Sequence, residues 1–297
     1  MEMLVQNQSR EPRKEPVGAA WKKYVGEVAW PTIMLTGAVF GAYMGVLWAS
    51  VTGFLPMWAG IALSTGLLYM IFTPMHEAAH GNIKGRKKSL SWLETSIGWL
   101  SAFMLFAPYP AFKVLHLRHH AETNNPTEDP DNWIASRNPL MLLFKCLTIM
   151  PDYYYHFFAK PYKQAREKIP AVLVGVLAIA GAFTALGMNF GWHVPLLLWL
   201  LPAILALGIL AIVFDWIPHH PHQERARYLD TRAIVMPGLE TLMLGQNYHL
   251  MHHLYPPIPF YQYGKAFHEM RPLLEEKGAP ILEPLKKAPV QPSTAEA

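Results

Sequence analysis

The chain has 297 residues, of which 52% are hydrophobic and 15% are charged, and its formal net charge is +4. So much apolar sequence is unusual for a soluble protein and favours a membrane protein. The single cysteine, Cys146, excludes an internal disulfide and a cysteine-based zinc or iron–sulfur site. Any metal site must therefore use histidine and carboxylate side chains, and 14 histidines are present.

Four apolar stretches without an internal charge are long enough to cross a bilayer, which takes about 20 helical residues. The connections within each pair are as short as Thr52-Gly53 and residues 191–193, so we expect two tight helical hairpins. The predicted fold class is therefore all-α, a polytopic membrane protein with four transmembrane helices in two hairpins. The predicted spans are Val28–Val51, Phe54–Phe72, Ala171–Phe190 and Val194–Phe214.

The distribution of lysine and arginine predicts how these spans are oriented. Five lie before the first span, 12 lie between the second and third, eight follow the fourth, and neither hairpin turn has one. Because basic residues are enriched in cytoplasmic loops, we expect both termini and the central segment to be cytoplasmic. Residues 1–16 are too polar for a secretory signal peptide, so we expect the first span to be retained.

Shorter apolar segments lie between the two predicted hairpins. Ser91–Phe106 and Asn138–Met150 are punctuated by prolines, and we expect them to be interfacial or cap helices. The chain is then expected to divide into a cytoplasmic N-terminal segment (1–27), a membrane domain (28–263) and a C-terminal tail (264–297). The final sequence, APVQPSTAEA, lacks apolar periodicity and is expected to be disordered.

The histidines are clustered with the spacing of metal ligands. His76 and His80 form an H-E-x-x-H sequence in TPMHEAAHG, and their i, i+4 spacing places both on one face of a helix. HLRHH and HLMHH each have spacing i, i+3, i+4, which predicts three imidazoles on one helical face. The candidate ligands in these two triplets are His116, His119, His120, His249, His252 and His253.

A further candidate region is FDWIPHHPH, at the end of the last predicted span. Asp215 is an acid at a membrane boundary, and His219 follows it by one helical turn, so both can face the same site. The sequence leaves open whether His220 and His222 also bind metal. Three histidines stand alone and are not expected to be ligands: His156, His193 and His268.

Nine candidate ligands are more than one metal ion needs. A catalytic zinc ion typically takes three ligands from the protein. Two six-coordinate ions with open positions would use nine imidazoles well, and imidazole is a suitable ligand for iron. The count therefore favours two iron ions over the single zinc ion that H-E-x-x-H alone suggests.

These motifs resemble those of the membrane fatty acid desaturase/hydroxylase superfamily of histidine-box di-iron proteins. HEAAHG, HLRHHAETNNPTEDPDNW, DWIPHHPH and NYHLMHHLYP carry the resemblance, which runs from about Phe54 to Tyr263. It implies four transmembrane helices and a cytoplasmic helical cap that holds a di-iron site formed by the nine histidines. In desaturases an asparagine one turn before the added histidine, here His219, can hold a metal-bound water. This chain departs from that pattern, because Asp215 occupies the position.

The resemblance implies oxygen-dependent oxidation of lipid C–H bonds, with O2 as co-substrate and no catalytic residue beyond the metal centre. A fatty acyl desaturase is the leading hypothesis, because NYHLMHHLYP is similar to the last box of acyl-chain desaturases. A carotenoid (beta-carotene) hydroxylase or ketolase is the alternative, because HEAAHG and IPHHP are similar to those bacterial enzymes. The chain lacks the HPGG segment of a fused cytochrome. The implied partners are therefore a lipid or isoprenoid substrate and an external electron donor of ferredoxin, rubredoxin or cytochrome type, without nucleic acid, at a bacterial inner membrane.

Two hypotheses of other classes stay open. A membrane zinc protease would use Glu77 as the general base that activates water, and a metal-binding membrane sensor would bind iron without consuming oxygen. In an oxidase, Glu77 is instead expected to orient an imidazole by a hydrogen bond. Asp129 and Asp131, in the loop after the second box, are candidates for the same role, as is Asp215 beside the metal.

Overall fold

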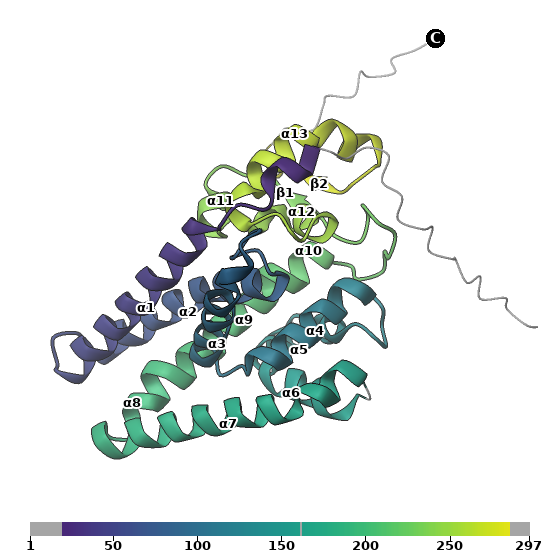
Figure 1. Cartoon of the computed structure of the whole chain (residues 1–297). Coiled ribbons are helices and arrows are strands. Elements are labelled where there is room, and N and C mark those ends of the chain that lie inside the picture. The colour runs from purple at the N-terminus through teal and green to yellow at the C-terminus, as the bar shows by residue number, and fades with distance from the viewer. Residues whose placement is uncertain (1–19, 161, 286–297) are drawn as a thin grey trace, which may run out of the picture.

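The computed structural model describes residues 20–160 and 162–285, and within them the chain is built mostly from helices (Figure 1). A two-stranded parallel sheet pairs β1 (Ala233–Ile234) with β2 (Ile281–Leu282). This sheet was not predicted, because two-residue strands leave no periodic pattern in the sequence. The prediction for APVQPSTAEA concerns residues outside the described part.

The helices follow one another along the chain with short connections. The longer ones are α1 (Trp30–Val51), α2 (Met57–His80), α3 (Ser91–Met104), α4 (Tyr109–Glu122), α5 (Pro139–Leu147), α6 (Ile149–Ala159), α7 (Lys163–Phe190), α9 (Leu201–Leu210) and α13 (Tyr263–Glu276). The shorter α-helices are α8 (His193–Pro195), α10 (Ile217–His219), α11 (Leu239–Leu242) and α12 (His249–Leu254). Two π-helical segments, η4 (Leu196–Leu200) and η5 (Ala211–Trp216), join α8, α9 and α10 into one long helix. The 3-10 helices are η1 (Ala20–Tyr24), η2 (Lys88–Leu90), η3 (Pro130–Ile134), η6 (Gln246–Tyr248) and η7 (Phe260–Gln262).

Four helical segments in the described chain are long and apolar enough to cross a membrane, which agrees with the number predicted. A bent pair, Lys88–Met104 with Tyr109–Glu122 at an angle of 97°, passes the same test as one broken span. The second and fourth segments run further than predicted, because the helix continues through polar residues as far as His80 and His219. The four are Trp30–Val51, Met57–His80, Gln164–Phe190 and His193–His219.

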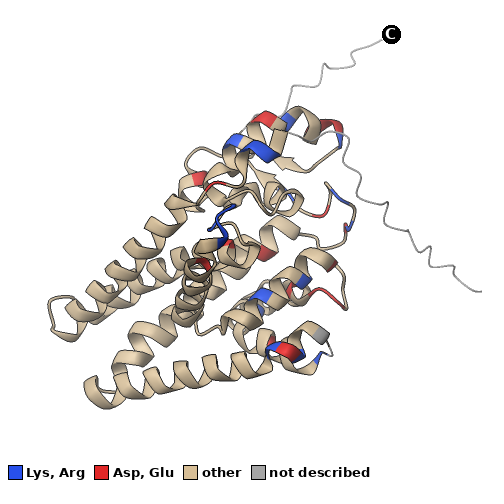
Figure 2. Ribbon diagram, viewed as in Figure 1, with Lys and Arg blue, Asp and Glu red and all other residues tan. Residues whose placement is uncertain are grey.

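The charged residues gather on one side of the molecule, near α10, α12 and α13 and over α4 and the start of α7 (Figure 2). The helices α1, α2, α7, α8 and α9 extend away from that side, and their far ends carry no charge in this view. Their surfaces expose large apolar side chains, including Met34 at 71% and Leu177 at 71%. Apolar faces of this extent are unfavourable in water and indicate contact with lipid.

Helix α2 lies at the centre and positions the first histidine pair. It packs against α1, α3, α4 and α9, and its buried Leu68, Ile71 and Met75 form the main core cluster. Ala203 and Ala206 of α9 are buried in the same cluster, and small residues of this kind let helices in membranes approach closely. The C-cap of α2 adopts the left-handed conformation that glycine accepts at lowest cost, at Gly81 with φ 77°.

A sharp turn between α3 and α4 brings the second histidine box back towards α2. The turn contains Phe106, whose φ of 56° is unusual for a residue other than glycine. The hydroxyl of Tyr154 donates to the carbonyl oxygen of Phe106 at 3.1 Å and supports this conformation. Pro108 follows as the N-cap of α4, which ends at the second box.

Candidate metal centre

The nine histidines with ligand spacing come together in two groups on the charged side of the molecule. Within each group, one ring nitrogen from every histidine lies within 4.8 Å of the others. The first group contains His76, His80, His116, His120 and His252. The second group contains His119, His219, His249 and His253.

Each triplet divides between the two groups, which differs from the single shared face that its spacing predicts. On α4, His116 and His120 belong to the first group, whereas His119 belongs to the second. On α12 the arrangement is reversed, because the middle histidine, His252, joins the first group. Adjacent residues on a helix point about 100° apart, so a triplet can reach two neighbouring centres.

The Nε2 atoms of the rings point towards one another. In the first group, the Nε2 atoms of His76 and His252 lie 2.9 Å apart, and those of His80 and His116 lie 2.7 Å apart. In the second group, the Nε2 atoms of His119 and His253 are separated by 3.3 Å.

Four of the imidazoles outside the spanning helices are held in the neutral form. Burial lowers the pKa of His116, His120, His252 and His253 well below the ordinary histidine value. A neutral imidazole has one N–H and one lone pair, and several lone pairs that converge within a buried space suit a bound cation. The donor set therefore fits two metal ions, and neutral imidazole suits iron.

The outer nitrogens of two rings are held by hydrogen bonds. The Nδ1 atom of His119 lies 2.8 Å from a carboxylate oxygen of Asp129 and 3.3 Å from one of Asp131. Burial opposes protonation of His119, but the negative charges of Asp129 and Asp131 outweigh it and raise the pKa of His119 to about 10. In the first group, the Nδ1 atom of His252 lies 2.9 Å from the hydroxyl of Tyr263. Such partners fix which ring nitrogen is turned inward.

Asp129 is itself held in place by the loop after α4. One carboxylate oxygen accepts a hydrogen bond from the backbone N–H of Asn124 at 2.7 Å, and the other accepts one from the backbone N–H of Asp131 at 2.9 Å. Asp129 and Asp131 are both buried. Both carboxylates lie beside the imidazole of His119.

Glu77 is placed differently from the expectation. No hydrogen bond between its carboxylate and an imidazole is found among residues 20–160 and 162–285. Its side chain accepts a hydrogen bond from the Nδ2 of Asn82 at 3.4 Å, and Asn82 also donates to the carbonyl oxygen of Pro256 at 2.9 Å. The hydrogen bond observed at Glu77 is therefore with Asn82 and not the expected one with an imidazole.

The remaining histidines belong to neither group within the described chain. The rings of His219 and His222 are 6.2 Å apart, centre to centre, and the His220 ring lies against Trp216 at 4.7 Å. His156 pairs with Asp152 at 3.0 Å and belongs to neither group.

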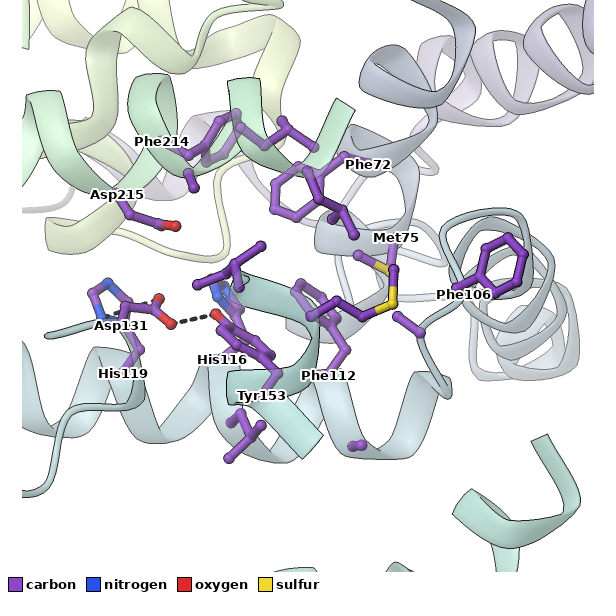
Figure 3. A pocket seen from close by; sticks show the side chains of 18 of the residues that line it. Phe72, Met75, Phe106, Phe112, His116, His119, Asp131, Tyr153, Phe214 and Asp215 are labelled. Atoms are coloured by element: carbon purple, nitrogen blue, oxygen red, sulfur yellow. Dashed lines mark hydrogen bonds and ion pairs between the residues drawn. The ribbon is translucent and has the colours of Figure 1, made fainter. Parts of the chain in front are cut away.

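An apolar cavity runs from the histidine groups between α2, α4, α6 and α9 (Figure 3). His119, Asp131 and Asp215 lie at one end of it, and Phe106 lies at the other (Figure 3). The hydroxyl of Tyr153 points into the cavity and donates a hydrogen bond to Asp131. The aromatic rings of the wall include those of Phe72, Phe112 and Phe214.

Sequence reasoning missed three residues that contact the site. Tyr263 holds His252, Tyr153 holds Asp131, and Asn82 ties the end of α2 to the loop after α12. None of them is part of a histidine motif. Tyr263 and Tyr153 reach the site only through tertiary packing, so no spacing pattern in the sequence marks them.

The sequence is similar to those of several known proteins. The sequence is 24% identical over 268 residues to an sn-1 oleoyl-lipid 12-desaturase of Picosynechococcus sp., a match that covers 80% of this chain and 75% of that protein. It is 25% identical over 243 residues to an sn-1 acyl-lipid omega-3 desaturase (ferredoxin) of Synechocystis sp., covering 71% of this chain and 66% of the relative. A dihydrorhizobitoxine desaturase of Bradyrhizobium elkanii is 26% identical over 230 residues, covering 65% of this chain and 62% of that protein.

The match extends to a whole protein family. The sequence pattern described as fatty acid desaturase matches residues 52–284. This range contains all nine clustered histidines and the residues that line the cavity. The chain therefore belongs to the fatty acid desaturase family.

Proposed function

We propose that this chain is an oxygen-dependent di-iron membrane oxidase that desaturates a fatty acyl chain of a lipid. The observation that carries the proposal is the pair of histidine groups, with five and four converging imidazoles, at the end of an apolar cavity. The five histidines around His76 would hold one iron ion, and the four around His219 would hold the other. Two such ions would supply activation of dioxygen, the chemistry needed to break an unactivated C–H bond.

The protein's own residues position the chain and keep water away. Phe72, Phe112 and Phe214 line the cavity next to the imidazoles, so methylene groups placed there contact apolar walls. Asp129 and Tyr263 hold two of the rings, one in each group. No acid or base from the protein is needed to bind the hydrocarbon, which is consistent with a cavity whose polar residues, including His119, Asp131 and Asp215, lie at one end.

The names of the relatives support the substrate and the partner that we propose. One is called an oleoyl-lipid desaturase, and another is called an acyl-lipid desaturase with ferredoxin in its name. Converting dioxygen to water while two hydrogens leave the acyl chain requires electrons from elsewhere, so we include an external donor of ferredoxin, rubredoxin or cytochrome type. A carotenoid hydroxylase or ketolase is the alternative that the experiment below separates.

The architecture that we propose for the membrane follows from the four apolar segments. The segments α1 with α2, and α7 with α8 to α10, would form two hairpins. The described part of residues 1–27, the helices α3 to α6 and the chain after α10 would form the cytoplasmic face with the metal site. A bacterial inner membrane is the proposed location, and the division at residues 28 and 263 remains a prediction.

The test is expression in a bacterium whose membrane lipids are saturated, with and without added beta-carotene. Mass spectrometry of the lipids should reveal a new acyl double bond that depends on oxygen, and no oxidised carotenoid. His252→Ala should abolish the product and lower the iron content of the purified protein below that of wild type. The control, His268→Ala, changes a histidine outside both groups and should leave both near wild type. Oxidised carotenoid with unchanged acyl chains would instead establish the alternative.

A further inference from the structure

A second apolar crevice lies beside the cavity, between α3 and α7. Its walls are formed by Trp99, Phe103, Val174, Gly175, Ala178 and Ile179, together with Ala107 and Pro108. Ala107 and Pro108 also line the cavity that leads to the histidines. The crevice and the cavity therefore share part of their wall at the turn between α3 and α4, at the end of the cavity marked by Phe106 in Figure 3.

The crevice faces the lipid region. Lys168 is the last charged residue of α7 before its apolar stretch. A helix rises 1.5 Å per residue, so Val174 and Ile179 lie about 9 and about 16 Å further along the axis. Val174 is 65% exposed and Leu177, on the same turn of the helix, is 71% exposed. These residues lie within a membrane-spanning segment, so the surface around the crevice is continuous with the surface that contacts hydrocarbon.

The two ends of the combined path differ in chemistry. The inner end contains the imidazoles and the carboxylates of Asp131 and Asp215, whereas every side chain that lines the crevice is apolar apart from the indole N–H of Trp99. A hydrocarbon chain could enter at the crevice without crossing charged or hydrated groups. Burial of each methylene group is favourable by about 0.8 kcal/mol relative to water. Passage of the acyl chain through water before it enters the cavity would therefore be unfavourable.

A glycine keeps this crevice open. A Cβ atom at Gly175 would lie 3.0 Å from the Trp99 ring and 3.2 Å from Pro108, closer than ordinary van der Waals contact. A larger side chain there would fill the space between α7 and the shared turn. Gly181 lies on the same helix, and a Cβ atom there would meet nothing within 4 Å. The same substitution at Gly175 and at Gly181 therefore gives a test variant and its control on one helix.

From this geometry we infer that an acyl chain still attached to a membrane lipid enters the site sideways through the crevice between α3 and α7. The inference rests on the proposed function, because it assumes that the cavity receives an acyl chain. It names the source of that chain, a bilayer lipid, and the residues that it passes, Gly175, Ala107 and Pro108. Chains delivered from the aqueous side would bypass these residues.

The experiment measures where the acyl chain of a lipid contacts the protein, and it does not require turnover. The iron-loaded protein is placed in phosphatidylcholine vesicles that contain phosphatidylcholine with a diazirine on one acyl chain, and cross-links are mapped by mass spectrometry. Wild type and Gly181→Leu should be labelled at cavity residues such as Phe112 and Tyr153. In Gly175→Leu the labelling of these cavity residues should fall about tenfold or more, because a leucine side chain would overpack the crevice and exclude the acyl chain. Ala178→Phe, which changes an exposed position on the same crevice, should act in the same direction.

Two results would overturn the route. One is equal cavity labelling in Gly175→Leu, Ala178→Phe and Gly181→Leu, and the other is no cavity labelling in wild type. Thermal unfolding of each variant checks that it is folded, and Ala178→Phe provides the test if Gly175→Leu is not. Because labelling needs no turnover, a wild type that is labelled in the cavity but oxidises no acyl chain would contradict the proposed function and leave the entry route intact.

Discussion

The Nδ1 atom of His119 lies 2.8 Å from a carboxylate oxygen of Asp129, in a contact that is buried on both sides. This contact determines which nitrogen of the ring faces the second histidine group, because the Nε2 atom on the opposite side then points towards His253. Carboxylates in this position orient ligating imidazoles and increase their basicity.

We predict that Asp129→Asn weakens iron binding by about 10–100-fold while the protein stays folded. An amide keeps the size of the side chain but removes the negative charge beside His119. The apparent iron affinity can be measured by competition with a chelator. Asp152→Asn is the control, since Asp152 pairs with His156, which lies outside both groups. Equal iron affinities in the two variants would contradict the role of Asp129.

Tyr263→Phe removes the hydroxyl that lies 2.9 Å from the Nδ1 of His252. We expect iron to be lost from the first group first, with a decrease in affinity of about tenfold, because the ring loses the group that orients it. Tyr261→Phe changes a neighbouring tyrosine whose ring lies against Phe260 rather than against a histidine. Iron content after dialysis against chelator should therefore fall in Tyr263→Phe and not in Tyr261→Phe.

The spans could be predicted because a run of about 20 apolar residues is a strong signal by itself. The residues at which these spans end could not be predicted in the same way. Hydropathy places the end of the second span at Phe72, but the helix runs on to His80, since backbone hydrogen bonding continues regardless of side-chain polarity. The two histidines of the first box are consequently part of the spanning helix. The small sheet of β1 and β2 could not be predicted either, because its strands are too short to show a periodic pattern in the sequence.

The site was partly accessible from sequence. Spacing selected the nine histidines that converge, because i, i+3 and i+4 relationships are local. The division of each triplet between two groups depends on how α2, α4 and α12 pack, and that is tertiary information. The same limit applies to Tyr263 and Tyr153, whose contacts cross 11 and 22 residues of sequence. Glu77 was expected to orient an imidazole, and its observed hydrogen-bond partner, Asn82, is not marked by any motif.

The orientation of the protein in the membrane can be tested independently of the metal. Since neither connection, 52–56 or 191–192, contains a lysine or arginine, we predict that both termini face the cytoplasm. Alkaline phosphatase, which is active only outside the cytoplasm, should be inactive when fused after the last residue and active when inserted at Gly53. Activity of the C-terminal fusion would overturn the proposed orientation and the cytoplasmic location of the site.

The last prediction concerns Glu77 and separates an oxidase from a zinc protease. In a protease with an H-E-x-x-H helix, the glutamate is the general base, and loss of general acid–base assistance typically costs about 10²–10⁴ in rate. Here the carboxylate accepts a hydrogen bond from Asn82, and the glutamine of Glu77→Gln can accept the same bond. A di-iron oxidase needs no carboxylate base to remove hydrogen from a C–H bond.

We therefore predict that Glu77→Gln retains its iron and oxidises acyl chains within about tenfold of wild type, because the hydrogen bond to Asn82 can be kept. The measurement is acyl-chain analysis together with iron content on the same preparation. His80→Ala would not help here, since it removes a ligand under either hypothesis. Complete loss of activity in Glu77→Gln with the metal fully retained would indicate acid–base chemistry at this carboxylate, which a hydrolase requires and the proposed oxidase does not.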